Sequence, residues 1–306
     1  MSKSVIIDAV RSPIGVKNGS MIGIRPDDLT AQVVQGLLDR NQGIAFEQIE
    51  DLSLGCAFPE GPQGMLMGRG VAVLAGLPHT TTANTVNRFC GSSMDALHQI
   101  STRIECGDIT VGIAAGVEDM FSIPNGGFAP DLNPLLADQE YYISMGETAE
   151  NLAKEGNISR EDQEAFTISS HEKALKAAKA GKFDNELIPI DLYEELTIEK
   201  DEGPREPDTE KIKSLPPAFI ENGTVTAATS SPFSIGAAAV LLTSEGFAKE
   251  HNLNIRASVV SRAVAGVEWE RMGVGPLPAT EKALAKAGLS LDDIDTIELN
   301  EAFAAQ

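Results

Sequence analysis

The sequence has few cysteines, few basic residues and no long apolar runs, and each shortage excludes a class of protein. Three cysteines in 306 residues cannot form a complete disulfide framework, so they fit a reducing, cytoplasmic compartment. With 24 Lys and Arg against 45 Asp and Glu, the net charge of −21 argues against nucleic acid or an anionic membrane as the main partner. No apolar run approaches the roughly 18 residues that cross a bilayer, so we expect no membrane insertion.

The remaining composition, with 42% hydrophobic and 23% charged residues, is typical of a globular protein. Strand-like residues 4–10 precede an amphipathic helix at residues 27–40, which places Leu29, Val33 and Leu37 on one face. This alternation predicts an α/β fold. It continues as a strand within 49–58, a helix near 64–75, a strand at 81–89, a helix at 91–105 and a strand at 109–118.

The domain organisation is predicted from a change of composition after residue 118. Residues 119–222 are rich in Pro, Asn, Gly and charged helical segments, and we interpret them as an inserted lobe. Residues 1–118 and 223–250 would then form one half, whose run from Gly236 to Ala239 suits a tightly packed helix or strand. Residues 251–306 would form a second, incomplete half, with a second sheet beginning within 254–268.

An internal repeat connects residues 46–58 with residues 291–303, which share apolar positions at one constant offset. Chance similarity of two helix-to-strand junctions is the alternative. If the repeat is genuine, the first copy continues into further helices and strands, whereas the sequence stops three residues after Phe303. The second half is therefore expected to be incomplete.

Cys90 is the cysteine whose setting indicates chemistry. A strand-like segment runs into it, and the Gly91-Ser92-Ser93 sequence opens an amphipathic helix. A helix N-terminus stabilises a thiolate, and the thiolate is the nucleophilic form. A buried structural thiol is the alternative. We interpret Cys56 and Cys106 as structural.

Eight motifs then resemble those of thiolases, in the order that thiolases have them. They are DAVRSPIG, QGMLMGR, VNRFCGSSMDALH with the nucleophile, AAGVEDM, MGETAENLA, GTVTAATSS and NEAFA, with MGVGPLPAT before the last. The segments PNGGFAPDLNP and ISMGETAE look more like the degradative 3-ketoacyl-CoA thiolases of fatty-acid β-oxidation than the biosynthetic enzymes.

The resemblance implies a duplicated α-β-α-β-α layered fold with a loop domain that covers coenzyme A. It also implies an activity: Cys90 attacks the 3-keto carbon of a 3-ketoacyl-CoA, acetyl-CoA leaves, and a second coenzyme A takes the acyl group. Coenzyme A is a co-substrate, and neither a metal nor a further cofactor is expected. The resemblance implies a homodimer or homotetramer, with residues 80–88 at a two-fold interface.

The resemblance assigns four further site residues. Asn300, in NEAF, would orient a water in an oxyanion hole, or else cap a strand end. Ser231 would touch the pantetheine arm, or be an ordinary turn serine. Arg205 would lie near the nucleotide of coenzyme A, or be a solvated loop charge. Met145 would line the pantetheine tunnel, or be core.

The sequence departs from the family pattern in two respects. Ile235 stands where thiolases commonly have Asp, and the Gly-His-Pro and Cys-Gly-Gly-Gly segments, which carry the base and the acid/base cysteine, are absent. We therefore expect the isolated chain to be inactive. A fragment, one chain of a two-chain enzyme with a separate C-terminal partner, and a degenerate protein all remain open. The rival function is a non-catalytic coenzyme A-binding or interaction protein with a thiolase fold.

Overall fold

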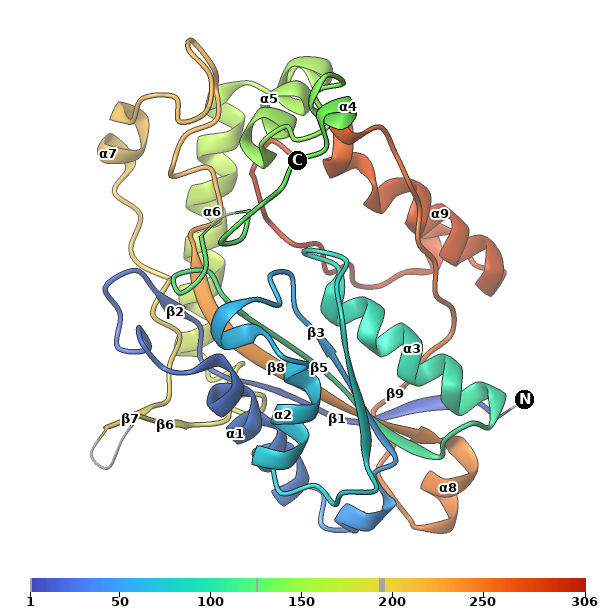
Figure 1. Cartoon of the computed structure of the whole chain (residues 1–306). Coiled ribbons are helices and arrows are strands. Elements are labelled where there is room, and N and C mark those ends of the chain that lie inside the picture. The colour runs from blue at the N-terminus through green and yellow to red at the C-terminus, as the bar shows by residue number, and fades with distance from the viewer. Residues whose placement is uncertain (1, 125, 193–195) are drawn as a thin grey trace. The chain divides into compact units, whose positions relative to one another are not determined.

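The computed structural model describes residues 2–124, 126–192 and 196–306, and the chain divides into two compact units (Figure 1). The first unit comprises Met1–Pro130, Phe183–Gly203 and Phe233–Val259. The second comprises Asp131–Lys182, Pro204–Pro232 and Val260–Gln306. The boundaries expected at 118, 222 and 250 were drawn from sequence composition and stay a prediction.

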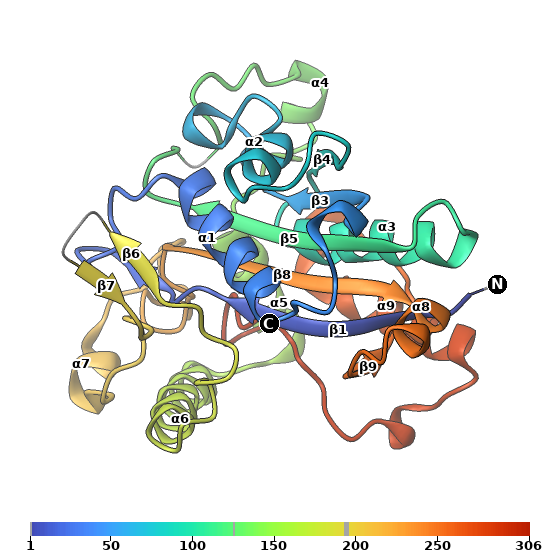
Figure 2. The same ribbon diagram turned by 90° about the horizontal axis from the view of Figure 1, so that it is seen from below.

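The first unit is built on a sheet of seven strands within the described residues, with the order β4-β3-β5-β8-β1-β9 and β2 paired with β8 (Figure 2). Strand β3 is parallel to both β4 and β5, whereas β8 is antiparallel to β5 and β1. Among these strands, β3 and β5 are almost wholly buried. The bounds are β1 Ser4–Arg11, β2 Gly15–Val16, β3 Asp51–Gly55, β4 Thr82–Val86, β5 Val111–Asp119, β8 Ser234–Ser244 and β9 Ala257–Ser258.

Helices cover both faces of this sheet. Helices α1 (Pro26–Asp39) and α2 (Met67–Leu74) pack on one face, and α3 (Ser92–Cys106) packs on the other, as Figures 1 and 2 show together. The predicted stripe on α1 is confirmed, because Leu29, Val33 and Leu37 are all fully buried. Burying each such side chain contributes about 1.5–3 kcal/mol before the opposing entropy is counted.

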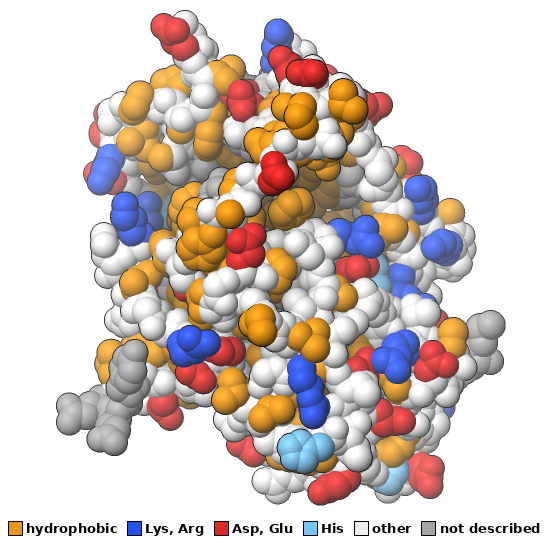
Figure 3. All heavy atoms as spheres, viewed as in Figure 1, with side chains coloured by type: hydrophobic (Ala, Val, Ile, Leu, Met, Phe, Trp, Pro, Cys, Tyr) orange, Lys and Arg blue, Asp and Glu red, His pale blue; other side chains and the backbone are white. Residues whose placement is uncertain are grey.

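Short elements complete the first unit. Strands β6 (Ile190–Leu192) and β7 (Leu196–Ile198) form an antiparallel pair, and α8 (Glu245–Glu250) follows β8. The guanidinium of Arg11 binds Asp201 through both terminal nitrogens and Glu186 through Nε at 2.7 Å. These bonds tie the returning segment to β1. On the face shown in Figure 3, acidic and basic side chains are interspersed over the elements of this unit.

The second unit is mainly helical. Its elements are α4 (Pro134–Ala137), α5 (Met145–Gly156), α6 (Arg160–Lys179), α7 (Thr209–Ser214), α9 (Pro276–Ala287) and the 3-10 helices η4 (Trp269–Val274) and η5 (Leu291–Asp293). Ser144 and Ser159 cap α5 and α6 through their hydroxyl groups. A small core is formed by Ala149, Ala153, Val225 and Ala305.

The expectation of a second sheet beginning within 254–268 is wrong for the described residues. Strand β9 pairs instead with β1, through Ser258 with Val5 and Ala257 with Ile6. The outer edge of β1 offers unpaired backbone groups, and the arriving segment satisfies them. The run from Gly236 to Ala239, left open between helix and strand, lies in β8.

The repeat has a structural counterpart at its start. The 3-10 helices η1 (Phe46–Gln48) and η5 occupy equivalent positions in the two copies. In each, the third side chain accepts a hydrogen bond from the residue before the helix: Gln48 Oε1 from the N–H of Ala45, and Asp293 Oδ2 from that of Ser290. The same local turn therefore forms twice, although only the first copy continues as a sheet strand.

Candidate active site

Cys90 lies in the connection between β4 and α3 and is exposed. The hydroxyl of Ser92 anchors this connection, because it accepts a bond from the N–H of Arg88 at 2.8 Å and donates to the carbonyl of Phe89 at 2.6 Å. Ser92 itself is buried. These two hydrogen bonds fix the backbone that carries the Cys90 thiol.

No side chain caps the first turn of α3. Gly91 occupies the N-cap and supplies no side-chain hydrogen bond, so no cap side chain satisfies the first-turn N–H groups. Phe89, the residue before the cysteine, has a φ of 44°, in the left-handed region. A phenylalanine adopts this conformation only when its surroundings hold it there, and such strain is common at functional sites.

Two glycines of the sheet let α3 approach closely. A Cβ on Gly55 of β3 would collide with the backbone of Ser92 and Ser93, and one on Gly116 of β5 would collide with the side chain of Ser93. The start of α3 therefore rests directly on two strand backbones. Sequence reasoning singled out Gly91 and missed these glycines, since only the sheet order brings them under the helix.

The three cysteines have different surroundings. Cys56 is buried, and burial, together with the charge of Glu118, raises the pKa of its thiol to about 12, which keeps it neutral and inert. Cys106 is the last residue of α3 and is exposed, which differs from the expected structural role. An accessible cysteine therefore lies at each end of α3, Cys90 just before its start and Cys106 as its last residue.

In the second unit, the segment that carries Ser231 lies beside the segment that follows Asn300. The N–H of Ser231 donates to the carbonyl of Ala302 at 2.8 Å, and the N–H of Ala304 donates to the carbonyl of Thr229 at 2.9 Å. Ser231 and Asn300 are both exposed on this pairing. The structure thus pairs Ser231 with Ala302, which follows it by 71 positions in the sequence.

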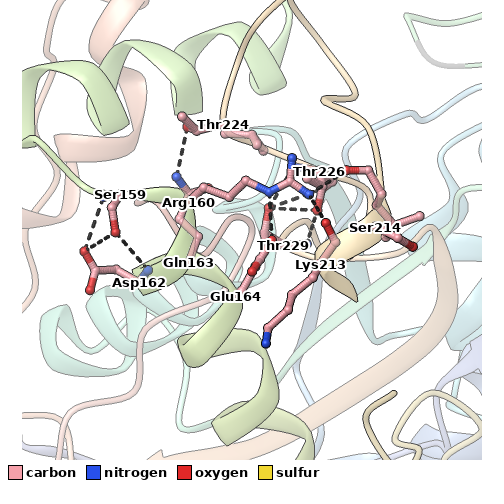
Figure 4. Close-up of polar contacts among 12 residues, drawn as sticks. Ser159, Arg160, Asp162, Gln163, Glu164, Lys213, Ser214, Thr224, Thr226 and Thr229 are labelled. Atoms are coloured by element: carbon pink, nitrogen blue, oxygen red, sulfur yellow. Dashed lines mark hydrogen bonds and ion pairs between the residues drawn. The ribbon is translucent and has the colours of Figure 1, made fainter. Parts of the chain in front are cut away.

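A polar network anchors the segment that leads to Ser231 (Figure 4). Gln163 of α6 donates to the hydroxyl of Thr224 at 3.0 Å, and buried Glu150 of α5 accepts from the N–H groups of Thr224 and Val225. Thr226 and Thr229 then close a turn in which the N–H of Thr226 donates to the Thr229 hydroxyl at 2.9 Å. Helices α5 and α6 therefore both fix the position of this turn.

Met145 begins α5 and is partly exposed, at 41%. The next residue, Gly146, lies against the ring of Phe219, where a Cβ would collide. Phe219 packs edge to face with Phe303 at a centroid distance of 5.8 Å. The start of α5 is connected in this way with the segment that carries Asn300.

Arg205 is exposed, and its backbone N–H donates to Nδ1 of His171 at 3.5 Å. Burial, followed by the positive charge of Arg205, lowers the pKa of His171. The guanidinium of Arg205 is therefore presented beside a neutral imidazole, on a lobe surface accessible to an anionic group.

Ile235, the residue that departs from the family pattern, is accommodated as core. It is 1% exposed, lies in β8 opposite Gly15 of β2, and belongs to the main apolar cluster. A Cβ on Gly15 would touch its side chain. The apolar side chain of Ile235 fills the space that Gly15, which has no side chain, leaves open.

Among the described residues, three or more His, Cys, Asp or Glu side chains nowhere gather as a metal would require. In that same part of the chain, every helix is too short or too polar to cross a membrane.

Comparison with known proteins gives one consistent family. The thiolase N-terminal domain family matches residues 4–246, and the thiolase C-terminal domain family matches residues 253–306. A 3-ketoacyl-CoA thiolase of Aliivibrio fischeri is 47% identical over 316 residues, which cover 100% of this chain and 81% of the relative. One of Bacillus subtilis is 43% identical, with 82% of its length covered.

Solved structures agree with the sequence relatives. The crystal structure of the Bacillus anthracis acetyl-CoA acetyltransferase superposes with a TM-score of 0.90 at 36% identity, over 100% of this chain and 81% of that one. The fold predicted from the motifs, a mixed α/β thiolase fold with a central sheet, is confirmed. With both thiolase domain families matched along its length, this chain belongs to the thiolase family.

Proposed function

We propose that Cys90 forms an acyl-enzyme in the transfer of an acyl group between 3-ketoacyl-CoA and coenzyme A. The observation that carries the proposal is the exposed thiol directly before the uncapped N-terminus of α3. First-turn N–H groups and the helix dipole favour the thiolate there, and sulfur is a good attacking and a good leaving group. A thioester intermediate also conserves the energy of the substrate thioester.

The substrate is proposed to be a 3-ketoacyl-CoA of fatty-acid β-oxidation. Support comes from the relatives named 3-ketoacyl-CoA thiolase at 43–47% identity. Asn300 is proposed to orient the oxyanion water, Ser231 and Met145 to contact pantetheine, and Arg205 to approach the nucleotide. The pairing of the Ser231 and Ala302 backbones supports a shared role for Asn300 and Ser231 in binding the substrate. Three free cysteines fit the expected cytoplasmic location.

The rival function, coenzyme A binding without catalysis, leaves the setting of Cys90 without a purpose. A protein that only binds coenzyme A needs neither an exposed cysteine at a helix start nor a strained residue before it. Incubation of the purified chain with acetyl-CoA, in the presence of a separate polypeptide that carries the histidine and cysteine motifs, separates the two. Acyl transfer adds an acetyl group to Cys90, seen by intact mass and peptide mapping, and Cys90→Ala removes it; binding alone adds no mass.

We also propose a homodimer, through the edge strand β4. This strand pairs with β3 on one side only within the described residues, which leaves an edge that a second copy can extend. Exposed apolar side chains flank it: Met65 at 99%, Leu66 at 56%, Phe89 at 63% and Met94 at 65%. Exposed apolar side chains beside an edge strand are typical of a subunit interface.

A further inference from the structure

Glu118, the penultimate residue of β5, binds the loop that follows the neighbouring strand β3. Its Oε2 accepts from the N–H of Ala57 at 2.6 Å and its Oε1 from the N–H of Phe58 at 3.3 Å. The side chain of Gln63 adds a third donor at 2.7 Å. One carboxylate therefore receives three N–H donors from the loop that follows β3.

Gln63 closes this arrangement from the other side. It is fully buried, its Nε2 also donates to the carbonyl of Phe58 at 2.9 Å, and its Oε1 accepts from the N–H of Asp119 at 2.6 Å. Burial raises the pKa of Glu118, and the bonds from Ala57, Gln63 and Phe58 oppose that rise. The loop after β3 is thus clamped to the end of β5.

The clamped turn reaches the nucleophile through one side chain. Nδ2 of Asn87 donates to the carbonyl of Ala57 at 2.9 Å, and Oδ1 of Asn87 accepts from the N–H of Phe89 at 2.8 Å. The rings of Phe58 and Phe89 also pack, with centroids 5.9 Å apart. These contacts act on the residue that holds a positive φ immediately before Cys90.

We propose that Glu118 is a positioning residue for Cys90. Its carboxylate fixes the turn at residues 57–58, and Asn87 transmits that restraint to the backbone of Phe89. The inference rests on the proposed function, since positioning of the thiol has a purpose only if Cys90 reacts. A fixed position matters for a nucleophile, because a misplacement of about 1 Å can cost about 10²-fold in rate.

Glu118→Gln tests the inference in a Cys106→Ser background, in which Cys90 is the accessible thiol. The glutamine side chain has the size of the glutamate, but its NH₂ group cannot accept the hydrogen bonds that a carboxylate oxygen of Glu118 accepts. We expect the alkylation of Cys90 by iodoacetamide to slow by about threefold or more at pH 7, and its pH midpoint to rise by about half a unit or more. Loss of a nearby negative charge without displacement would move the midpoint down, and that result overturns the proposal.

Glu50→Gln is the matched control. Glu50 also accepts two backbone N–H groups, those of Thr110 and Val111, but at the opposite end of β5. Its substitution should leave the alkylation profile of Cys90 unchanged. An equal shift in this variant would show a general effect on the sheet and would overturn the specific role of Glu118.

Asn87→Ala provides a second route if Glu118→Gln does not fold. It should shift the Cys90 profile in the same direction, and the double variant should shift it no further than the larger single change, because both act through one chain of contacts. Independent, multiplying effects would overturn the proposal.

The acetylation assay separates the two claims. If wild-type Cys90 is acetylated and Glu118→Gln leaves the alkylation profile unchanged, the positioning role is overturned and the proposed function stands. If wild-type Cys90 is not acetylated, the proposed function fails, while the shift in alkylation still supports the positioning role.

Discussion

Ser93 in the first turn of α3 lies directly over Gly116 of β5, so closely that a single added methyl group would collide with the serine side chain. We expect Gly116→Ala to destabilise the protein by about 1–3 kcal/mol, as overpacking does, and to displace the start of α3. Urea unfolding measures the change. Gly70→Ala, within α2 and with open space around it, is the control and should be neutral or stabilising. Equal stability of the two variants would contradict the close packing.

Cysteine labelling compares the two ends of one helix. Cys90 precedes the N-terminus of α3 and Cys106 ends it, and both are exposed. The helix dipole favours a thiolate at the first position and disfavours it at the second, by about 0.3–1 kcal/mol each. We expect a haloacetamide near pH 7 to label Cys90 severalfold faster, with Cys56 unlabelled, as followed by peptide mapping. Faster labelling of Cys106 or Cys56 would refute the assignment.

The raised pKa of Cys56 predicts how the free energy of unfolding depends on pH in the alkaline range. Its pKa is raised in the folded protein from 9.0 to about 12, so the thiol contributes stability that is complete below pH 9 and is lost as the pH rises towards 12. Wild type should lose up to about 1.4 kcal/mol per pH unit in this window relative to Cys56→Ala. Denaturant unfolding at pH 8, 9 and 10 of both proteins measures this. Parallel curves would exclude the effect.

The dimer proposal is tested with two leucines of similar exposure. Leu66 lies beside β4 and is 56% exposed, and Leu196 in β7 is 50% exposed. We expect Leu66→Glu to raise the dissociation constant of the dimer at least about tenfold and Leu196→Glu to leave it unchanged, measured by sedimentation. A monomeric wild type at micromolar concentration, with residues 81–87 exchanging freely with deuterium, would disprove the interface.

The activity of a polypeptide of these 306 residues is expected to be very low. The histidine base and second cysteine that the family resemblance assigns to the reaction are not among them, and loss of a general base costs about 10²–10⁴-fold. Losses from residues that act together do not multiply, so we expect the rate to lie at the residual level of an enzyme without its catalytic base, and not lower still. The assay follows loss of the 3-ketoacyl-CoA enolate absorbance.

Addition of a separate polypeptide that carries the histidine and cysteine motifs should restore thiolysis, and Cys90→Ala should abolish the restored activity. Robust coenzyme A-dependent cleavage by the 306 residues alone that survived Cys90→Ala would refute the mechanism.

The sequence by itself determined the local structure of this protein, meaning its helices and the turn that carries Cys90. The spacing of Leu29, Val33 and Leu37 predicts α1, because side chains at that spacing share one face of any helix. The run of strand-forming residues before Cys90 and the glycine after it predict a strand-to-helix turn with the thiol at its centre. These features depend on neighbours in the chain, and the pattern of neighbours is visible in the sequence.

Contacts between distant segments were decided only by the tertiary structure. Both copies of the repeat make the same 3-10 turn, yet residues 51–55 become a buried strand because β4 and β5 lie on either side, whereas Ile297 and Leu299 stay exposed. The clamp of Glu118 on residues 57–58 likewise depends on strand order. A strand is stabilised by partners that the sequence does not specify locally, and the same holds for a partly buried carboxylate such as Glu118.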